Sequence, residues 1–243
     1  MGAVAAGLAH EIRNPLNSLY INSQLLEEML AELPDAEVPQ KKDLLSLARA
    51  NLKVTQRLSE TLTGFLRFAR PPAMEIALHD LNRIVSETLR FLAADFECRG
   101  ISVRSRLHPA PLPVLADGKL VKQALLNLLL NAQEAMDKEK KEIRVATGVT
   151  RRGLYVRIGD NGRGIPAPDR RNIFRLFFTT RKNGSGLGLP IVRQIVRQHG
   201  GAIHVRSHEG AGTTMTVVFP FEERFRALFP GRLPRALPEG GHR

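Results

Sequence analysis

Apolar residues in the first 70 positions of the chain recur in alternating steps of three and four. One series comprises Ala9, Ile12, Leu16, Leu19, Ser23, Leu26, Leu30 and Leu33, in which Ser23 is the polar interruption. A second series comprises Leu44, Ala48, Thr55, Leu58, Leu62 and Phe65. This spacing is typical of the contact seam of a coiled coil, and Pro34 and Pro39 between the two series interrupt a helix. The pattern therefore predicts two long helices joined by a short turn.

The predicted hairpin is too small to bury its own seam. We therefore expect two copies of the chain to pair through their hairpins into a four-helix bundle, as a homodimer. The expected organisation is a hairpin over residues 1–70, a linker over residues 71–78, a second domain over residues 79–221 and a poorly ordered tail over residues 222–243. The linker is indicated by Arg70, Pro71 and Pro72, and the tail by its proline, glycine and arginine content.

Beyond residue 78 the pattern predicts helices mixed with paired strands. Asp80 and Asp117 precede two apolar periodic segments and are expected to cap helices reaching about Cys98 and Met136. A third helix is expected over residues 189–199. Alternating segments predict strands over residues 101–107, 143–149, 154–158, 202–207 and 213–219. This order of elements favours an α+β fold in which helices pack on one sheet.

Composition and charge restrict the classes of partner. The 243 residues carry a formal net charge of +12, which fits either an arginine-rich composition or an anionic ligand and an acidic partner surface. The chain has no tryptophan and few aromatic residues, so we expect no nucleic-acid partner. Its single cysteine, Cys98, excludes an internal disulfide and fits a reducing, cytoplasmic compartment. No apolar stretch reaches the roughly 20 residues of a membrane helix, so we expect no membrane segment within the chain.

Two glycine-rich segments are candidates for nucleotide contact. Asp160–Gly164 reads D-N-G-R-G and follows a predicted strand directly, so Asp160 can accept a hydrogen bond from an exocyclic amine such as that of adenine. Gly184–Gly188 reads G-S-G-L-G and leads into a helix, whose free amides and dipole favour phosphate. Neither is a Walker loop or a dinucleotide fingerprint. Taken alone, the first also fits a tight turn and the second a flexible loop.

Polar residues elsewhere add candidates for binding. Asn127 and Asn131 share one helix face, where amide oxygens can bind Mg²⁺, although a pair of ordinary surface or core amides fits as well. Between the glycine segments, residues 172–182 combine aromatic residues with a polar end. This composition fits a mobile lid that reaches phosphates, or an ordinary hydrophobic anchor beside a loop.

His10 is the candidate nucleophile of the predicted hairpin. Counting along the seam places His10 beside it, toward solvent. The neighbouring Glu11 can orient the imidazole and take its proton, which makes the free ring nitrogen a better nucleophile. Asn14, one helical turn beyond, can hold a water near a phosphoryl group. A single exposed histidine carries little information, so this interpretation depends on the other segments.

In combination, five segments resemble the signature boxes of two-component sensor histidine kinases. They are AHEIRNPL at Ala9–Leu16, NLLLNA at Asn127–Ala132, DNGRGIP at Asp160–Pro166, IFRLFFTT at Ile173–Thr180 and GSGLGLPIV at Gly184–Val192. Their order and spacing resemble the family over nearly the whole chain. The short lid with FFTTR looks most like the nitrogen-regulation branch. The resemblance implies a dimerising histidine phosphotransfer hairpin followed by an α/β sandwich of the Bergerat (GHKL) type.

The resemblance also implies chemical roles. His10 corresponds to the phosphorylated histidine, Glu11 to its assisting acid and Asn14 to the residue that supports dephosphorylation of the partner. The implied activity is autophosphorylation from ATP, followed by transfer to an aspartate on the receiver domain of a response regulator. Removal of phosphate from that regulator is implied as well.

For the nucleotide, the resemblance implies that ATP and Mg²⁺ are the cofactors. Asn127 and Asn131 correspond to the asparagines of the Mg²⁺–ATP site, and Asp160 to the acid that reads adenine. The implied nucleotide loops contain Gly162, Gly164, Thr180, Lys182, Gly184, Gly186, Leu187 and Gly188. Only nine residues precede His10, fewer than is usual in the family, so we expect the first helix to be truncated at Met1 and part of the seam to be missing.

Two other classes of protein share some of these features. A gyrase-like or chaperone-like ATPase has a related nucleotide domain, but it lacks the histidine hairpin and usually carries a catalytic glutamate one turn before the second asparagine, where this chain has Asn127. A non-catalytic dimeric scaffold that binds nucleotide and docks a regulator is the second alternative. Labelling of His10 by ATP distinguishes it from a kinase.

Overall fold

The computed structural model describes residues 2–32, 41–69, 73–181 and 184–221. Within the helices, the side chains of residues 2–15, 41, 57, 60–61 and 64–69 lie outside this description. The chain forms two compact units, Met1–Ala73 and Met74–Arg243. Among the described helices, none combines the length and the apolar character that a membrane span requires.

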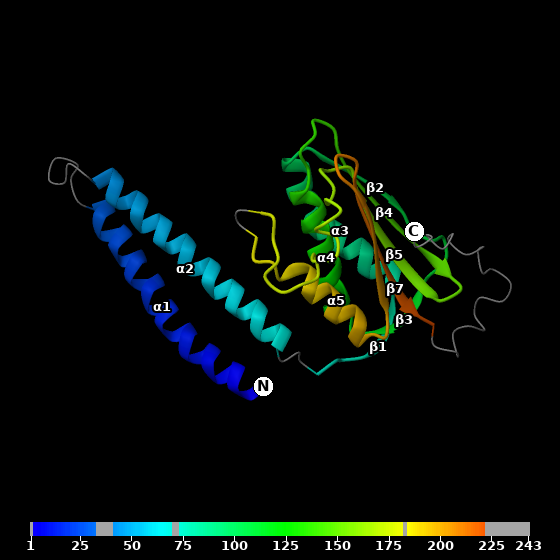
Figure 1. The fold of residues 1–243 in the computed structure, drawn as a ribbon, viewed down its shortest axis with the longest axis horizontal. Helices are drawn as coiled ribbons and strands as arrows, with labels where there is room; N and C mark the ends of the chain where they lie inside the picture. The colour runs from blue at the N-terminus through cyan, green and yellow to red at the C-terminus, as the bar shows by residue number, and fades with distance from the viewer. Residues whose placement is uncertain (1, 33–40, 70–72, 182–183, 222–243) are drawn as a thin grey trace. The chain divides into compact units, whose positions relative to one another are not determined.

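The first unit is a pair of long helices, α1 (Gly2–Glu32) and α2 (Lys41–Ala69), which lie side by side (Figure 1). Their contact buries Leu16 and Leu30 of α1 and Ala48 of α2, and Arg49 forms an ion pair with Glu27 at 2.7 Å. The two predicted helices are therefore confirmed. The turn expected between Pro34 and Pro39 lies outside the described residues, as does the tail expected beyond residue 221.

The apolar seam of the hairpin is only partly covered by its own partner helix. Leu16 and Leu30 are buried, whereas the intervening Leu19 and Leu26 are 55% and 47% exposed. On α2, Leu58 is also half exposed. The described part of the α1 seam therefore packs inside the hairpin at Leu16 and Leu30 and presents Leu19 and Leu26 to the surface.

The second unit is built on a five-stranded sheet in the order β2-β4-β5-β7-β6. Neighbouring strands are antiparallel, apart from β2 and β4, which are parallel. The strand bounds are Ile101–Arg106 for β2, Lys141–Thr150 for β4, Gly153–Asp160 for β5, Ala202–His208 for β6 and Gly212–Pro220 for β7. These strands confirm the five that the alternation predicts.

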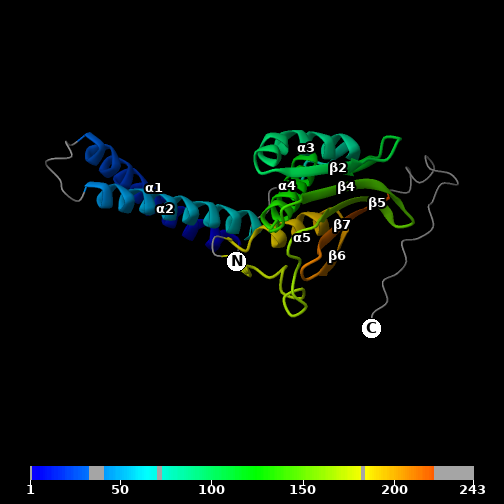
Figure 2. The same cartoon turned by 90° about the horizontal axis from the view of Figure 1, so that it is seen from above.

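Three helices cover one face of this sheet: α3 (Leu81–Cys98), α4 (Gly118–Glu134) and α5 (Gly188–Gln198) (Figures 1 and 2). They and the sheet form one apolar core, whose most enclosed large side chains include Phe96, Leu125, Ile143, Val156 and Phe219. The core confirms the predicted α+β fold with helices on one sheet. Burial of this apolar area is the main favourable term in folding.

A second, smaller sheet differs from the prediction. The strands β1 (Ala77–Asp80) and β3 (Pro113–Ala116) pair antiparallel. Neither was expected, and β1 begins inside the segment interpreted as a linker. Each strand has four residues, too few for a clear alternation, and their pairing depends on a partner more than 30 positions away in the chain.

Both predicted helix caps are confirmed. Asp80 accepts a hydrogen bond from the backbone N–H of Asn82, and its carboxylate also binds the N–H of Leu112. Asp117 is nearly buried and accepts from three backbone amides, those of Lys119, Leu120 and Glu75. Burial raises the pKa of Asp117, but the three amides outweigh it and hold the pKa below its ordinary value.

His199 joins the start of α4 to the end of α5. The backbone N–H of Asp117 lies 3.0 Å from Nε2 of His199, and Nδ1 lies 2.7 Å from the carbonyl oxygen of Ile195. The neutral tautomer with its proton on Nδ1 satisfies both contacts. Because the N-terminus of α4 meets the C-terminus of α5, the opposite ends of these two helices are also brought together.

Removal of the Asp117 carboxylate is expected to destabilise the second unit. Asp117→Ala leaves buried amides at the start of α4 without a partner, which costs about 2 kcal/mol of unfolding free energy. Urea unfolding at neutral pH measures the loss, with Asp137→Ala, an exposed carboxylate beyond α4, as the control. A loss below about 0.5 kcal/mol, the size of an ordinary surface substitution, contradicts the assigned role.

Candidate functional site

The C-terminal half of α4 lies beside the N-terminus of α5. A Cβ atom added to Gly188, the first residue of α5, would lie 3.5 Å from Nδ2 of Asn131. Asn127 is one turn earlier on α4 and half buried, and its side chain makes no hydrogen bond within the described part of the chain. Two amide side chains therefore share one helix face, as predicted, and one of them reaches the start of α5.

Asp160 ends β5 with a largely buried carboxylate. Its Oδ1 accepts hydrogen bonds from the backbone N–H groups of Gly162 at 3.0 Å and Thr213 at 3.2 Å. Its Oδ2 makes no hydrogen bond with any described residue. Burial raises the pKa of Asp160, against the smaller opposing effect of the two amides. One oxygen thus fixes the loop, and the other remains available as an acceptor.

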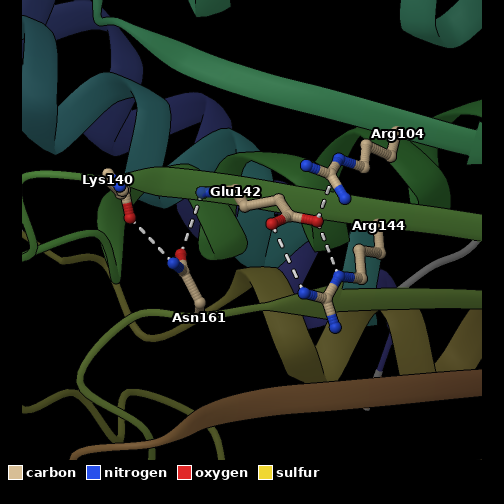
Figure 3. A network of polar contacts seen from close by, with 5 residues as sticks. All are labelled: Arg104, Lys140, Glu142, Arg144 and Asn161. Atoms are coloured by element: carbon tan, nitrogen blue, oxygen red, sulfur yellow. Dashed lines mark hydrogen bonds and ion pairs between the residues drawn. The ribbon is translucent and has the colours of Figure 1, made fainter.

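Asn161 ties the loop after Asp160 to the start of β4 (Figure 3). Its Oδ1 accepts from the backbone N–H of Glu142 at 2.9 Å, and its Nδ2 donates to the carbonyl of Lys140 at 2.8 Å. Figure 3 shows the carboxylate of Glu142 turned away from Asn161 toward Arg104 and Arg144, with its closest contact 2.6 Å from Nε of Arg144. Asn161 therefore holds the loop through main-chain contacts alone.

Two glycines allow this loop to pass close to neighbouring backbone. A Cβ on Gly162 would lie 2.2 Å from the carbonyl oxygen of Ala135, just past the end of α4. Gly164 has a φ of +71°, and a Cβ there would lie 2.0 Å from the carbonyl oxygen of His208. Between them, the N–H of Arg163 donates to Ala135 at 3.0 Å. The loop is therefore fastened one turn beyond Asn131.

The second glycine segment folds against the residues that precede it. Gly186 has a φ of +67°, and a Cβ there would lie 2.4 Å from the carbonyl carbon of Phe177. The N–H of Phe177 donates back to the carbonyl of Gly186, and Phe177 itself has a positive φ of 62°. Leu187 is buried and precedes α5 as its N-cap, without a side-chain hydrogen bond to the helix amides. The first amides of α5 therefore lack side-chain capping.

Arg181 reaches from this segment to α4. Its Nη1 donates to Oδ1 of Asn131 and its Nη2 to the backbone oxygen of Asn131, both at 3.1 Å. It also forms an ion pair with Glu134. The guanidinium is mostly buried, and burial lowers its pKa, although an arginine remains charged. A positive group thus lies against the amide oxygen predicted to bind metal.

The chemistry of these groups fits a divalent cation only in company with a ligand. No cluster of three or more histidine, cysteine or acidic side chains is present among the described residues. The available electron-pair donors are amide oxygens, and Oδ1 of Asn131 accepts a hydrogen bond from the cationic guanidinium of Arg181. Mg²⁺ typically uses few protein oxygens together with substrate phosphates and water.

The other predicted site residues lie in the first unit or in the segment before Gly186. His10, Glu11 and Asn14 lie within α1, but their side chains are outside the described part of the structure. Lys182 is also outside it. Thr180 is exposed, and Gly184 packs against Thr179, where an added Cβ would meet the hydroxyl at 2.2 Å. Asn127, Asn131, Asp160, Thr180 and both glycine segments are therefore the predicted residues that the structure describes within the second unit.

Three structural contributors were not among the predicted site residues. Asn161 anchors the loop, His199 links the two site helices, and Arg181 contacts Asn131. Asn161 lies inside a predicted box, but its role depends on β4, which no local pattern connects to it. Arg181 was expected only as part of a polar lid end. Its target on α4, 50 positions earlier, has no signal in the sequence.

Comparison with known families matches both units. Residues 1–73 match the His Kinase A (phospho-acceptor) domain, and residues 116–223 match the histidine kinase-, DNA gyrase B-, and HSP90-like ATPase family. The sensor histidine kinase ZraS of Escherichia coli (strain K12) is 34% identical over 220 residues, which cover 90% of this chain and 45% of ZraS. The chain thus spans just under half the length of that relative.

Solved structures of histidine kinases resemble this fold. Full-length ShkA in complex with AMPPNP aligns over 91% of this chain and 46% of its own, with a TM-score of 0.73 and 25% identity. The catalytic domain of ThkA aligns over 60% of this chain and 96% of its own, with a TM-score of 0.56 and 31% identity. ThkA in complex with the response regulator protein TrrA aligns over 90% and 61%, with a TM-score of 0.63 and 27% identity. With a phospho-acceptor domain followed by an ATPase domain, the chain belongs to the histidine kinase family.

Proposed function

We propose that this chain is the catalytic core of a sensor histidine kinase, which transfers the γ-phosphoryl group of ATP to His10 and from there to an aspartate of a response regulator. The observation that carries the proposal is the largely buried Asp160 carboxylate, in which one oxygen is held by two amides and the other makes no hydrogen bond with a described residue. In the same unit, Asn131 faces the first residue of α5, a helix whose N-cap makes no side-chain hydrogen bond. This arrangement suits a ligand with an amine at one end and phosphates at the other.

The adenine end of the site is assigned to Asp160. Its Oδ1 is held by Gly162 and Thr213, so Oδ2 is oriented without needing to reorganise when it accepts from the exocyclic amine. Gly162 and Gly164 let the loop after Asp160 pass close to the backbone of Ala135 and His208, which fixes the position of this loop. The alignment of ShkA, solved with AMPPNP, supports a nucleotide as the ligand.

The phosphate end is assigned to the start of α5 and to α4. The first amides of α5, which lack a side-chain cap, and the helix dipole favour anionic groups, and Gly188 at the helix start faces Asn131. Gly184 and Gly186, in the loop before α5, are assigned to the same phosphates. Asn127 and Asn131 would hold Mg²⁺ through their amide oxygens. When bound, this ion neutralises phosphate charge. Thr180 and Lys182 are the further groups assigned to the phosphates.

His10 is assigned as the acceptor. One ring nitrogen attacks the γ-phosphorus, the new P–N bond forms as the bond to the β,γ-bridging oxygen breaks, and ADP leaves. Glu11 takes the proton from the other ring nitrogen. A carboxylate oxygen of the regulator then attacks the phosphorus, the P–N bond breaks and His10 recovers its proton. Asn14 is assigned to hold the water that later removes phosphate from the regulator.

The exposed seam leucines support a homodimer. Leu19, Leu26 and Leu58 lie on the surface of a hairpin that buries the neighbouring seam positions. A second copy provides the same surface, so paired hairpins complete a four-helix bundle. The complex of ThkA with TrrA supports a response regulator as the second partner. We further assign the chain to the nitrogen-regulation branch, on its FFTTR segment, and to the cytoplasm.

Loss of the acceptor is expected to abolish labelling without loss of nucleotide binding. His10→Gln cannot form a P–N bond, so incubation with γ-labelled ATP should give no acid-labile, alkali-stable phosphoprotein. ADP binding by calorimetry should remain unchanged, because the proposed nucleotide residues lie in the second unit. Equal labelling of His10→Gln and the natural chain contradicts the assignment.

Asp160→Asn is expected to weaken ADP binding by about tenfold or more, because an amide group can present a donor where adenine needs an acceptor. The pKa of Asp160 is raised by burial, so its ionisation opposes folding as pH rises from the ordinary value, 3.8, through the folded value. At neutral pH the substitution removes this cost. The melting temperature of Asp160→Asn should therefore equal or exceed that of the natural chain. If the melting temperature falls instead, so that partial unfolding explains the weaker ADP binding, the assignment of Asp160 to adenine is contradicted.

A charge on the exposed seam is expected to dissociate the dimer. Leu26→Glu places a carboxylate where two hairpins meet, and sedimentation velocity should show a shift from dimer to monomer. Leu47→Glu is the matched control, because Leu47 is similarly exposed on α2 but lies outside the apolar series. A dimer that survives Leu26→Glu and dissociates with Leu47→Glu contradicts the seam as the interface.

A further inference from the structure

Arg181 makes the most enclosed charged contact of the segment between the two glycine boxes. The guanidinium donates to both oxygens of Asn131 and pairs with Glu134, and its side chain is 26% exposed. The exposed Arg175, six positions earlier, has no comparable contact with a described residue. Of these two arginines, Arg181 is therefore the one that binds the C-terminal part of α4.

This contact competes with the proposed metal. Oδ1 of Asn131 is the oxygen assigned above to Mg²⁺, and it accepts from Nη1 of Arg181 at 3.1 Å. A divalent cation on the same oxygen would lie within a few ångströms of the guanidinium charge, where like charges repel strongly in a partly buried site. The two cations therefore cannot share Asn131 in this arrangement.

We infer that Arg181 is an internal cation that occupies Asn131 in the nucleotide-free protein and must leave when a Mg²⁺–nucleotide complex binds. This inference rests on the proposed nucleotide site. Asp160 makes no hydrogen bond or ion pair with Arg181, so the contact of Arg181 with Asn131 does not involve the adenine end of the proposed site. The nucleotide therefore engages Asp160 first, and metal binding at Asn131 then displaces the arginine.

Displacement of Arg181 also moves its own segment. The N–H of Arg181 is bound by the hydroxyl of Thr179, and its carbonyl accepts from the N–H of Gly184. Phe177 and Gly186 are joined by a further backbone hydrogen bond. Because Arg181 is linked to both sides of the segment, release from α4 frees the backbone between the glycine boxes. A site that must first release an internal competitor binds its ligand with reduced apparent affinity.

The test compares ADP binding by calorimetry in EDTA and in saturating Mg²⁺. Arg181→Met removes the guanidinium and keeps an unbranched side chain, and Arg175→Met removes one exposed positive charge from the same segment as the control. For Arg181→Met we expect the ADP Kd in Mg²⁺ to fall about tenfold, which is the effect of one charge-assisted hydrogen bond. The Kd in EDTA should be unchanged, and Arg175→Met should match the natural chain in both conditions.

An ADP Kd in Mg²⁺ that is unchanged or higher in Arg181→Met overturns the inference. Hydrogen exchange of residues 174–181 in the nucleotide-free protein gives a second readout, which should be faster in Arg181→Met and unaltered in Arg175→Met. Unaltered exchange in Arg181→Met overturns the proposed docking of the segment. If the natural chain binds no ADP in either condition, the proposed function fails as well, whereas normal binding with an unaltered Kd rejects only the role of Arg181.

Discussion

The proposed nucleotide site depends on the hydrogen bonds that two backbone amides donate to one oxygen of the Asp160 carboxylate, which leave the other oxygen for a ligand. A buried charge is costly, and the two backbone amides of Gly162 and Thr213 offset only part of that cost, as the raised pKa indicates. Both amides belong to backbone that other contacts fix. Gly162 is pressed against the end of α4, and Thr213 lies in β7, where it pairs with Ser207 of β6. The acceptor oxygen is thus positioned by the sheet and by α4 together.

The fold supplies the second half of the site through the pairing of α4 with α5. His199 and Asp117 fasten one end of this helix pair, and the other end brings Asn131 to the start of α5. Arg181 contacts Asn131 at this same end, so α4, the start of α5 and the segment that carries Arg181 meet there although they are far apart in the sequence. A cation that binds Asn131 would therefore displace Arg181 and release the segment that carries it.

Local patterns predicted most elements of the fold because each carries its own signal. The caps at Asp80 and Asp117 and the five long strands follow from side-chain chemistry and alternation within a few residues. The missed strands, β1 and β3, are held by pairing with each other rather than by local preference. The site residues likewise divide into those with a local sequence signal and those positioned by long-range contacts. Asp160 and the glycines were predictable from motifs, whereas Asn161, His199 and the target of Arg181 depend on long-range contacts.

The two units of the chain divide the proposed chemistry, with nucleotide contacts in one and His10 in the other. The most direct measurement of the central claim is therefore the position of the phosphate. The intact chain would be incubated with Mg²⁺–ATP, digested under neutral conditions and fragmented by electron-transfer mass spectrometry. We expect one phosphorylated residue, His10. A phosphate on any other residue, or ATP hydrolysis to free phosphate with an unmodified chain, would contradict it.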